Sequence, residues 1–375
     1  MEPFKNAISP DLVKLIAVHL GRQLPAFDRA GFTGSVIEQL PSLELKQRVS
    51  LIADAIHEVL PSEGGARHRI MLAMLHPDDE NRANQPSTED GLCGWGVWPL
   101  TQVVGKHGLS EFDASLDLLR EMTKRGTAEF DVRPFLVHDQ RRAIDIMAGW
   151  VDDSNEHVRR LVSEGTRPRL PWGIRLNALI QDPTPTLPLL QALRDNPSDY
   201  VRRSVANHMN DIAKDHADLV AGLAHDWMKG ASSDRVKLIR HACRTLIKRG
   251  HAPTLAAFGL KPPDIRNPQL QIIQPDVAFG NGVEFEVVVH SKSNSEQKLV
   301  LDYVVHFRKA KGSLAPKVFK WTTITLQPSE RRELKRYHAI KPITTRRYYP
   351  GKHALSLRIN GHDFEHVDFN LVMPE

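Results

Sequence analysis

Apolar and polar residues follow two different rhythms along this chain, and the first is that of α-helices. Between about residue 110 and residue 258, apolar residues recur three and four positions apart in short blocks. Polar turns such as VDDSNE, TRPRLP, QDPTPTLP, RDNPSD and GASSD separate these blocks. Ser9, Pro10 and Asp11 indicate the start of another helix near the N-terminus. We therefore expect a region of many short helices.

The second rhythm starts near Gln269 and has the period of two that is typical of β-strands. VEFEVVVHS, KLVLDYVVHF, KVFKWTTITL, ALSLRIN and HVDFNLV alternate apolar with polar residues, and GNG, KGS, QPSE and YPGK separate them. This spacing predicts a sandwich of roughly seven strands with an immunoglobulin-like layout.

Two irregular stretches divide the chain into three predicted parts. Residues 76–91 are rich in Asp, Asn and Pro, and residues 260–269 include two adjacent prolines, which stop a helix. We expect an N-terminal helical cap and linker at 1–90, the main helical array at 91–260 and the β-sandwich at 269–375.

An acid followed three and four positions later by basic residues recurs in the helical region. Glu156-His-Val-Arg159-Arg160 is matched by Asp199-Tyr-Val-Arg202-Arg203, and more loosely by Asp234-Arg-Val-Lys237 and by Glu121-Met-Thr-Lys124-Arg125. The spacings, in chain order, are 35, 43 and 35 residues. Periods of this length are typical of HEAT-like helix pairs, which stack into a solenoid with one long concave surface. The predicted fold is therefore mainly α, a HEAT-like α-solenoid followed by an immunoglobulin-like β-sandwich.

Two of these patterns lie at expected helix starts, where free amides and the helix dipole attract phosphate. Asp153 with Glu156 three positions later predicts a capping box, and Asn196-Pro197 places proline at a first helical position. Basic side chains there would hold DNA phosphates, which gives affinity without reading sequence. The predicted phosphate ligands are Arg159, Arg160, Arg202 and Arg203.

The alternative is a structural role, in which the acids cap helices and the cations are solvated or form a ladder between repeats. In the upstream pattern Glu121 falls late in its own helix, so Glu129 or Asp131 is an alternative equivalent of Glu156.

Aromatic and histidine side chains near these patterns are further candidates. Trp172 in RPRLPWGIR would lie against a sugar or a cationic base. Trp95 and Trp98 lie among three glycines, where a packed turn is the simpler expectation. Asn207 and His208 follow the second arginine pair by about one turn and would share the DNA-facing surface, and the alternative for His208 is a satisfied core histidine.

The formal net charge of +5 is unevenly distributed. Residues 269–375 contain 16 Lys and Arg against 11 Asp and Glu, which leaves 34 of each in the first 268 residues out of totals of 50 and 45. This excess indicates a polyanionic partner for the β-sandwich. The segments FRKAKGSLAPK, ERRELKR and TTRRYYPGKH suggest a second contact with DNA, with Arg346 and Arg347 at its tip, and the alternative is a protein-docking module.

The positions of the cysteines and the absence of several motifs exclude some classes of protein. Cys93 and Cys243 are far apart and form no cluster, so we expect no metal site and no disulfide framework. Lys14 and His19 interrupt the apolar N-terminal patch, so we expect no signal peptide, no membrane contact and a cytoplasmic protein. GxSxG, HExxH, P-loop and dinucleotide motifs are absent, so we expect no nucleotide cofactor.

The stretch from about Leu92 to Leu223 resembles the AlkC branch of the AlkC/AlkD family of alkylpurine DNA glycosylases. The matching segments are EDGLCGWGVWPL, LLREMTKRGTAEFDVRPFL, WVDDSNEHVRRLVSEGTRPRLPWG and DNPSDYVRRSVANHM. The β-sandwich is similar to the immunoglobulin-like extension of some AlkC members.

The resemblance implies a DNA repair enzyme. We expect it to need no cofactor and to associate with the nucleoid, and we take a monomer as the default because the sequence does not indicate an oligomeric state. The enzyme would release cationic alkylated bases of the 3-methyladenine type from double-stranded DNA and leave an abasic site. Such a base leaves neutral, while the sugar becomes an oxocarbenium-like cation that a carboxylate stabilises. We expect Glu156 to be that carboxylate, with Glu121 second and Asp199 third, and Trp172 to be the aromatic partner.

The competing hypothesis is a HEAT-array scaffold that binds DNA or protein without catalysis. Acids on a DNA-facing surface favour the enzyme, because a pure phosphate clamp would avoid carboxylates there. The equal numbers of acids and bases in the first 268 residues agree with the enzyme.

Overall fold

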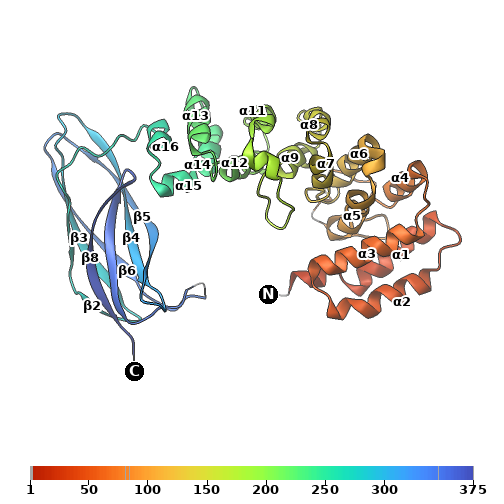
Figure 1. Ribbon diagram of the computed structural model, residues 1–375, viewed down its shortest axis with the longest axis horizontal. Coiled ribbons are helices and arrows are strands. Elements are labelled where there is room, and N and C mark those ends of the chain that lie inside the picture. Colours follow the sequence, from red (N-terminus) through yellow and green to blue (C-terminus); the bar gives the residue numbers. More distant parts are fainter. Residues whose placement is uncertain (1–2, 81, 84, 345, 375) are drawn as a thin grey trace. The chain divides into compact units, whose positions relative to one another are not determined.

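The computed structural model describes residues 3–80, 82–83, 85–344 and 346–374. Within these residues, helices occupy the chain as far as residue 257 and strands begin at residue 269 (Figure 1). The chain divides into two compact units. The first extends to Asp215 and includes Ser232–Ala242, and the second combines His216–Ala231 with the chain from Cys243 onward. No described helix is both long and apolar enough to cross a membrane.

The first unit consists of short α-helices joined by tight turns and single 3-10 turns, as the turn-rich sequence predicts. Its first elements are η1 (Phe4–Ala7), α1 (Pro10–Gln23), α2 (Arg29–Gln39), η2 (Leu40–Ser42), α3 (Leu45–Val59), α4 (Gly64–Ala73), η3 (Gly94–Gly96), α5 (Trp98–His107) and η4 (Leu109–Glu111). Then follow α6 (Phe112–Thr123), α7 (Arg133–His138), α8 (Gln140–Ala148), α9 (Glu156–Gly165), α10 (Asn177–Gln181), η5 (Thr184–Thr186), α11 (Leu187–Leu193), α12 (Asp199–Ile212) and α14 (Ser233–Ala242).

Start signals in the sequence explain where several helices begin. Ser9 caps α1 by accepting a hydrogen bond from the Leu12 amide at 3.2 Å, as expected. The predicted cap of α9 was wrong, because Asn155, and not Asp153, accepts from an amide of its first turn, that of His157 at 2.9 Å. Asp153 instead accepts a hydrogen bond from the Asn155 amide at 2.9 Å.

Helices α9, α12 and α14 lie side by side in the first unit. Their buried apolar residues recur at helical spacing, as Val158, Leu161 and Val162 do in α9. Each helix thus buries its apolar stripe against its neighbours, which is the packing of a HEAT-like solenoid. The first unit confirms the predicted helical fold.

The second unit contains the β-sandwich and three helices. The helices are α13 (Ala217–Met228), α15 (Arg244–Arg249) and α16 (Ala252–Ala257). The strands are β1 (Gln269–Ile272), β2 (Asp276–Ala278), β3 (Gly282–His290), β4 (Gln297–Arg308), β5 (Leu314–Leu326), β6 (Arg331–Ala339), β7 (Gly351–Ile359) and β8 (His362–Val372). One sheet has the order β1-β3-β6 and the other β2-β8-β7-β4-β5, and all pairs are antiparallel except β2 with β8.

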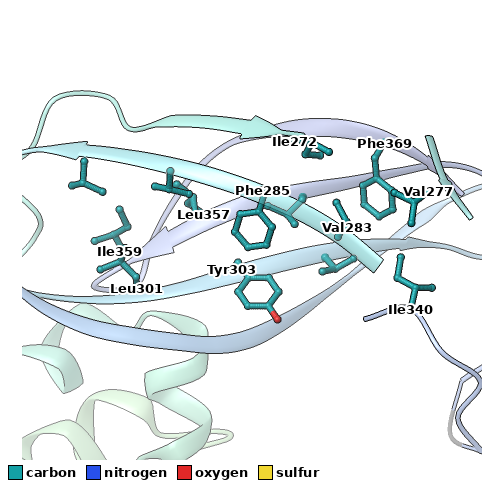
Figure 2. Packing of buried hydrophobic residues seen from close by; sticks show 14 of the residues in the cluster. Ile272, Val277, Val283, Phe285, Leu301, Tyr303, Ile340, Leu357, Ile359 and Phe369 are labelled. Atoms are coloured by element: carbon teal, nitrogen blue, oxygen red, sulfur yellow. The ribbon is translucent and has the colours of Figure 1, made fainter. Parts of the chain in front are cut away.

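The sandwich core follows the alternation read from the sequence. In β3, Val283, Phe285, Val287 and Val289 are fully buried, while Glu284 and its alternate neighbours are more exposed. Figure 2 shows Phe285 and Tyr303 facing each other between the sheets, with ring centroids 5.2 Å apart. The predicted immunoglobulin-like sandwich is confirmed, with eight described strands where about seven were expected.

Candidate active site

A cavity of about 490 Å³ in the first unit gathers aromatic and charged side chains from several helices and turns. Its aromatic walls are Trp95, Trp98, Phe130, His157, Trp172 and Tyr200. Its charged lining residues are Glu129, Arg160, Glu164 and Arg167. Aromatic walls with a few convergent polar groups are typical of a binding site for a small planar molecule.

Helix α9 supplies the charged centre of this cavity. Arg160 and Glu164 lie one turn apart and therefore share a face of α9. The Nη1 atom of Arg160 lies 2.7 Å from Glu129 Oε2, and its Nη2 atom lies 3.7 Å from Glu164 Oε1. The guanidinium also covers the ring of Tyr200, with Cζ 4.9 Å from the ring centroid. Arg160 thus holds two carboxylates and one aromatic ring in place.

Glu164 is buried and remains ionised because cations and a hydroxyl surround it. Arg167 Nη1 lies 2.6 Å from Glu164 Oε1, and Ser204 Oγ donates to Glu164 Oε2 at 2.6 Å. Burial by itself would raise the pKa of Glu164, but Arg160 and Arg167 hold it below its usual value. Arg167 is in turn paired with Asp211 at 2.8 Å. The cavity therefore contains a fixed negative charge whose compensating cations are locked in position.

The loop that carries Trp172 is held rigidly beside the cavity. Arg133 is fully buried and donates to the carbonyl oxygens of Gly165, Arg167 and Ile174 at 2.8, 2.9 and 2.7 Å. Lys46 Nζ donates to the carbonyl oxygen of Trp172.

Trp172 itself adopts a φ of 66° and is 59% exposed. A bulky residue in this backbone region is uncommon and costs of order 1 kcal/mol or more. The loop therefore presents an indole to solvent in a fixed, strained conformation.

Trp95 and Trp98 belong to the cavity wall, although a packed turn was the simpler expectation for both. Trp98 is buried and stacks on Phe130 with ring centroids 5.3 Å apart, while Trp95 is 40% exposed. Burial lowers the pKa of His157, which also lines the cavity, so this imidazole is neutral near pH 7.

Three carboxylates are predicted from the sequence to be catalytic: Glu156, Glu121 and Asp199. None of them is among the described residues that line the cavity. Glu121 lies near the end of α6 and pairs with the lysine three positions later at 2.9 Å. Glu156 is the exposed first residue of α9, one turn before Arg160, and it accepts a hydrogen bond from Ser198. Asp199 begins α12, and Arg203 at 2.5 Å lowers the pKa of this carboxyl.

Several predicted DNA ligands are bound within the protein. Arg159 and Arg202 donate to backbone carbonyls of the turns before their helices. His208 is fully buried, contacts the Ser163 carbonyl through Nδ1 at 3.0 Å, and has its pKa lowered to about 4 by burial. This geometry matches the alternative of a satisfied core histidine.

Of the other predicted DNA ligands, Arg203 and Arg347 are exposed, while Asn207 and Arg346 are half-buried. Arg203 is 62% exposed and pairs with Asp199, while Asn207 Oδ1 lies 2.9 Å from His241 Nε2. In the β-sandwich, Arg346 covers the Phe307 ring at 3.8 Å, and Arg347 is exposed.

Glu164 and Arg167 line the cavity but are not among the residues that the sequence predicts for the site, and Glu129 is predicted only as an alternative repeat equivalent of Glu156. Glu156, Arg160 and Glu164 are spaced by four, which places them on one helix face and is the signal that could have pointed to Glu164. Among the described residues, no three His, Cys, Asp or Glu side chains are grouped so as to hold a metal ion.

Known proteins match this chain in sequence and in structure over 99% of its length. A family model described as "Uncharacterised protein YhaZ, C-terminal Ig-like domain" matches residues 266–373. The uncharacterized protein YhaZ of Bacillus subtilis (strain 168) is 36% identical over 373 residues, which cover 99% of this chain and 100% of that protein. A solved structure of the Pseudomonas fluorescens alkylpurine DNA glycosylase AlkC, bound to DNA containing an abasic site analog, is 32% identical with a TM-score of 0.83, and the match covers 99% of this chain and 100% of that chain. This chain therefore belongs to the AlkC branch of the AlkC/AlkD family and has a C-terminal immunoglobulin-like domain.

Proposed function

We propose that this protein is a DNA N-glycosylase that hydrolyses the N-glycosidic bond of cationic alkylated bases, of the 3-methyladenine type, in double-stranded DNA. The observation that carries the proposal is the aromatic cavity in which Arg160 links Glu129 and Glu164. The likeness to an alkylpurine DNA glycosylase over 99% of the chain supports it.

The chemistry of a cationic lesion suits such a cavity. A base alkylated on a ring nitrogen already carries positive charge, so it leaves neutral and needs no strong general acid. Indole and phenol faces attract the cation through their ring quadrupoles. As the bond breaks, positive charge moves to the sugar, and fixed carboxylates stabilise it because they need no reorganisation during the reaction.

We assign this electrostatic role to Glu129 and Glu164. Glu164 is buried and fully hydrogen-bonded, so it supplies a fixed charge. Glu129 is only partly buried and is held by Arg160 and Thr127, so it is the better placed of the two to orient the attacking water. Glu156 is the competing assignment for this carboxylate, because it lies one turn before Arg160 on α9.

We assign DNA backbone contacts to exposed cations. Arg203 in α12 and Arg347 in the β-sandwich have guanidinium groups that a phosphate can reach. The excess of basic residues in the sandwich supports a second DNA contact there.

The test is the release of 3-methyladenine from methylated double-stranded DNA, measured beside binding to an abasic duplex. We expect the wild-type protein to release the base and to bind the abasic duplex. Binding without any base release would contradict the enzyme and favour the scaffold hypothesis.

A further inference from the structure

Asp211 is a buried carboxylate next to the cavity, and the proposed reaction does not use it directly. It lies in the last turn of α12 and is 2% exposed. Its Oδ2 atom lies 2.8 Å from Nε of Arg167, whose Nη1 atom lies 2.6 Å from Glu164 Oε1. Arg167 and Glu164 line the cavity, whereas Asp211 is not among its described lining residues. One guanidinium thus joins a carboxylate of the cavity to a carboxylate outside it.

The contact with Asp211 fixes the orientation of Arg167. A guanidinium is planar and presents its donors in a rigid fork, so the bond from Nε to Asp211 determines where Nη1 points. Burial by itself would lower the pKa of Arg167, but Glu164 and Asp211 raise it above its usual value. Arg167 therefore stays charged, and Asp211 holds it in the position where it contacts Glu164.

Asp211 also completes the balance of charge around the cavity. Three arginines and three carboxylates, each with a side chain at most 16% exposed, interact electrostatically there: Arg133, Arg160 and Arg167 with Glu129, Glu164 and Asp211. Lys214 also pairs with Asp211, at 2.8 Å, but its side chain is 40% exposed, so water screens its charge. Without the Asp211 carboxylate, this buried group would carry one excess positive charge.

We propose that Asp211 is a positioning residue for bond cleavage, which holds Arg167 against Glu164 and balances its charge so that the cavity favours a cationic sugar. This inference rests on the proposed function. The sugar becomes positively charged in the transition state, and an excess positive charge beside the cavity would oppose that step. Charges interact strongly across a buried site, so Asp211 acts without touching the substrate.

The experiment compares binding of the full-length protein to two abasic duplexes. One contains a pyrrolidine nucleotide, whose protonated ring nitrogen carries a positive charge like that of the transition state, and the other contains a neutral tetrahydrofuran nucleotide. We expect the wild type to prefer the cationic duplex, because transition-state analogues bind tightly. Asp211→Asn should lower this preference about tenfold, because one buried negative charge is lost, and should leave affinity for the neutral duplex within about twofold.

Asp215→Asn is the matched control. Asp215 lies four residues after Asp211 and accepts two hydrogen bonds from Arg169, at 2.9 Å each, but neither residue is among the described residues that line the cavity. Asp215→Asn should keep the wild-type preference within about twofold, although it removes the same charge, because this pair is partly exposed. Asp211→Glu retains the charge and should keep the preference within about threefold of the wild type. Asp211→Ser is a second replacement, and thermal unfolding midpoints show whether each variant is folded.

Single-turnover release of 3-methyladenine by the same variants separates this inference from the proposed function. Asp211→Asn should slow base release about tenfold, which matches its loss of preference for the cationic duplex. If the wild type releases the base but folded Asp211→Asn or Asp211→Ser keeps the wild-type preference, the inference is wrong. Equal weakening of binding to both duplexes would show a structural role alone and would also overturn it. If the wild type releases no base at all, the proposed function itself has failed, and this inference, which rests on it, falls too.

Discussion

Arg159 and Arg202 make the same contacts at equivalent places in two neighbouring helices. Each guanidinium donates through Nη1 to the carbonyl oxygens six and five residues before it, those of Asp153 and Ser154 at 2.5 and 2.8 Å and those of Asn196 and Pro197 at 2.6 and 2.8 Å. The two helices that the sequence predicts to be repeats therefore share equivalent hydrogen bonds. In each, the first arginine of the pair binds the turn that precedes its own helix.

This relationship predicts that Arg159→Ala destabilises the protein more than it weakens DNA binding. Two carbonyls would lose their donor, which costs about 1–3 kcal/mol in the free energy of unfolding. Arg203→Ala is the matched control, because it removes one exposed i,i+4 pair, worth roughly 0.2–0.5 kcal/mol, and a proposed phosphate contact.

Urea unfolding followed by circular dichroism and salt-dependent DNA binding should separate the two variants. Arg203→Ala should lower the slope of log affinity against log salt by about one, with stability nearly unchanged. The assignment fails if Arg159→Ala retains wild-type stability but loses DNA affinity.

The buried carboxyl of Asp131 should make the free energy of unfolding depend on pH. Burial raises the pKa of this carboxyl from 3.8 to about 7, with a hydrogen bond from Thr101 acting in the opposite direction. A raised folded-state pKa means that the stabilising contribution is complete below pH 3.8 and is lost as the pH rises toward 7. Asp131→Asn should therefore be more stable than the wild type above pH 7, by up to about 4 kcal/mol from the cost of roughly 1.4 kcal/mol per pKa unit.

Denaturant unfolding at a series of pH values between 4 and 8 checks the Asp131 prediction. The advantage of Asp131→Asn should shrink steadily as the pH falls and vanish near pH 4. A difference that does not change with pH would show that the Asp131 pKa is not raised.

Replacement of Arg133 should reduce activity, because Arg133 fixes the loop that carries Trp172. A lysine cannot reproduce the fork that reaches three carbonyl groups, so Arg133→Lys should loosen the Trp172 loop. We expect base release to fall roughly tenfold to a hundredfold, because small misplacements of a site are costly, while affinity for an abasic duplex changes much less. Arg142→Lys, on a surface arginine paired with Asp113, is the control and should retain both properties. Unaltered base release by Arg133→Lys would mean that Trp172 is not needed in its observed position.

Arg347 predicts a DNA contact by the β-sandwich. Arg347→Ala should reduce affinity for a duplex and lower the salt slope by about one, because one phosphate contact is lost. Arg331→Ala removes the same charge from an arginine already paired with Glu333 at 2.7 Å, so its effect should be smaller. Equal effects of the two variants would indicate a general influence of charge and not a contact at Arg347.

The fold was largely predictable because it depends on periodic patterns. Helical spacing, the alternation in β3 and the Ser9 cap of α1 are local signals, and each led to the observed element. The cap of α9 was not predictable in the same way, because Asp153, Ser154 and Asn155 can all cap a helix, and only the pairing of Asp153 with Arg120 decides among them.

The site was less predictable because its members come from distant segments. Glu129 precedes α7, Glu164 lies in the last turn of α9, and Tyr200 lies in the first turn of α12, so no contiguous motif contains them. The pattern of acid and arginine at helix starts predicts Glu156 and Asp199, yet packing brings Glu164, the buried acid one turn beyond Arg160, into the cavity. Burial and pairing of charges depend on which helices become neighbours, and a single sequence does not show that.

A comparison of three single substitutions tests the assignment of this cavity as the place of bond cleavage. Single-turnover release of 3-methyladenine should fall at least about a hundredfold for Glu129→Gln and for Glu164→Gln, because each removes a fixed charge from the transition state. Glu156→Gln should stay within a few-fold of the wild type, and all three variants should still bind an abasic duplex. Full loss of base release in Glu156→Gln, with activity retained in both other variants, would contradict the account.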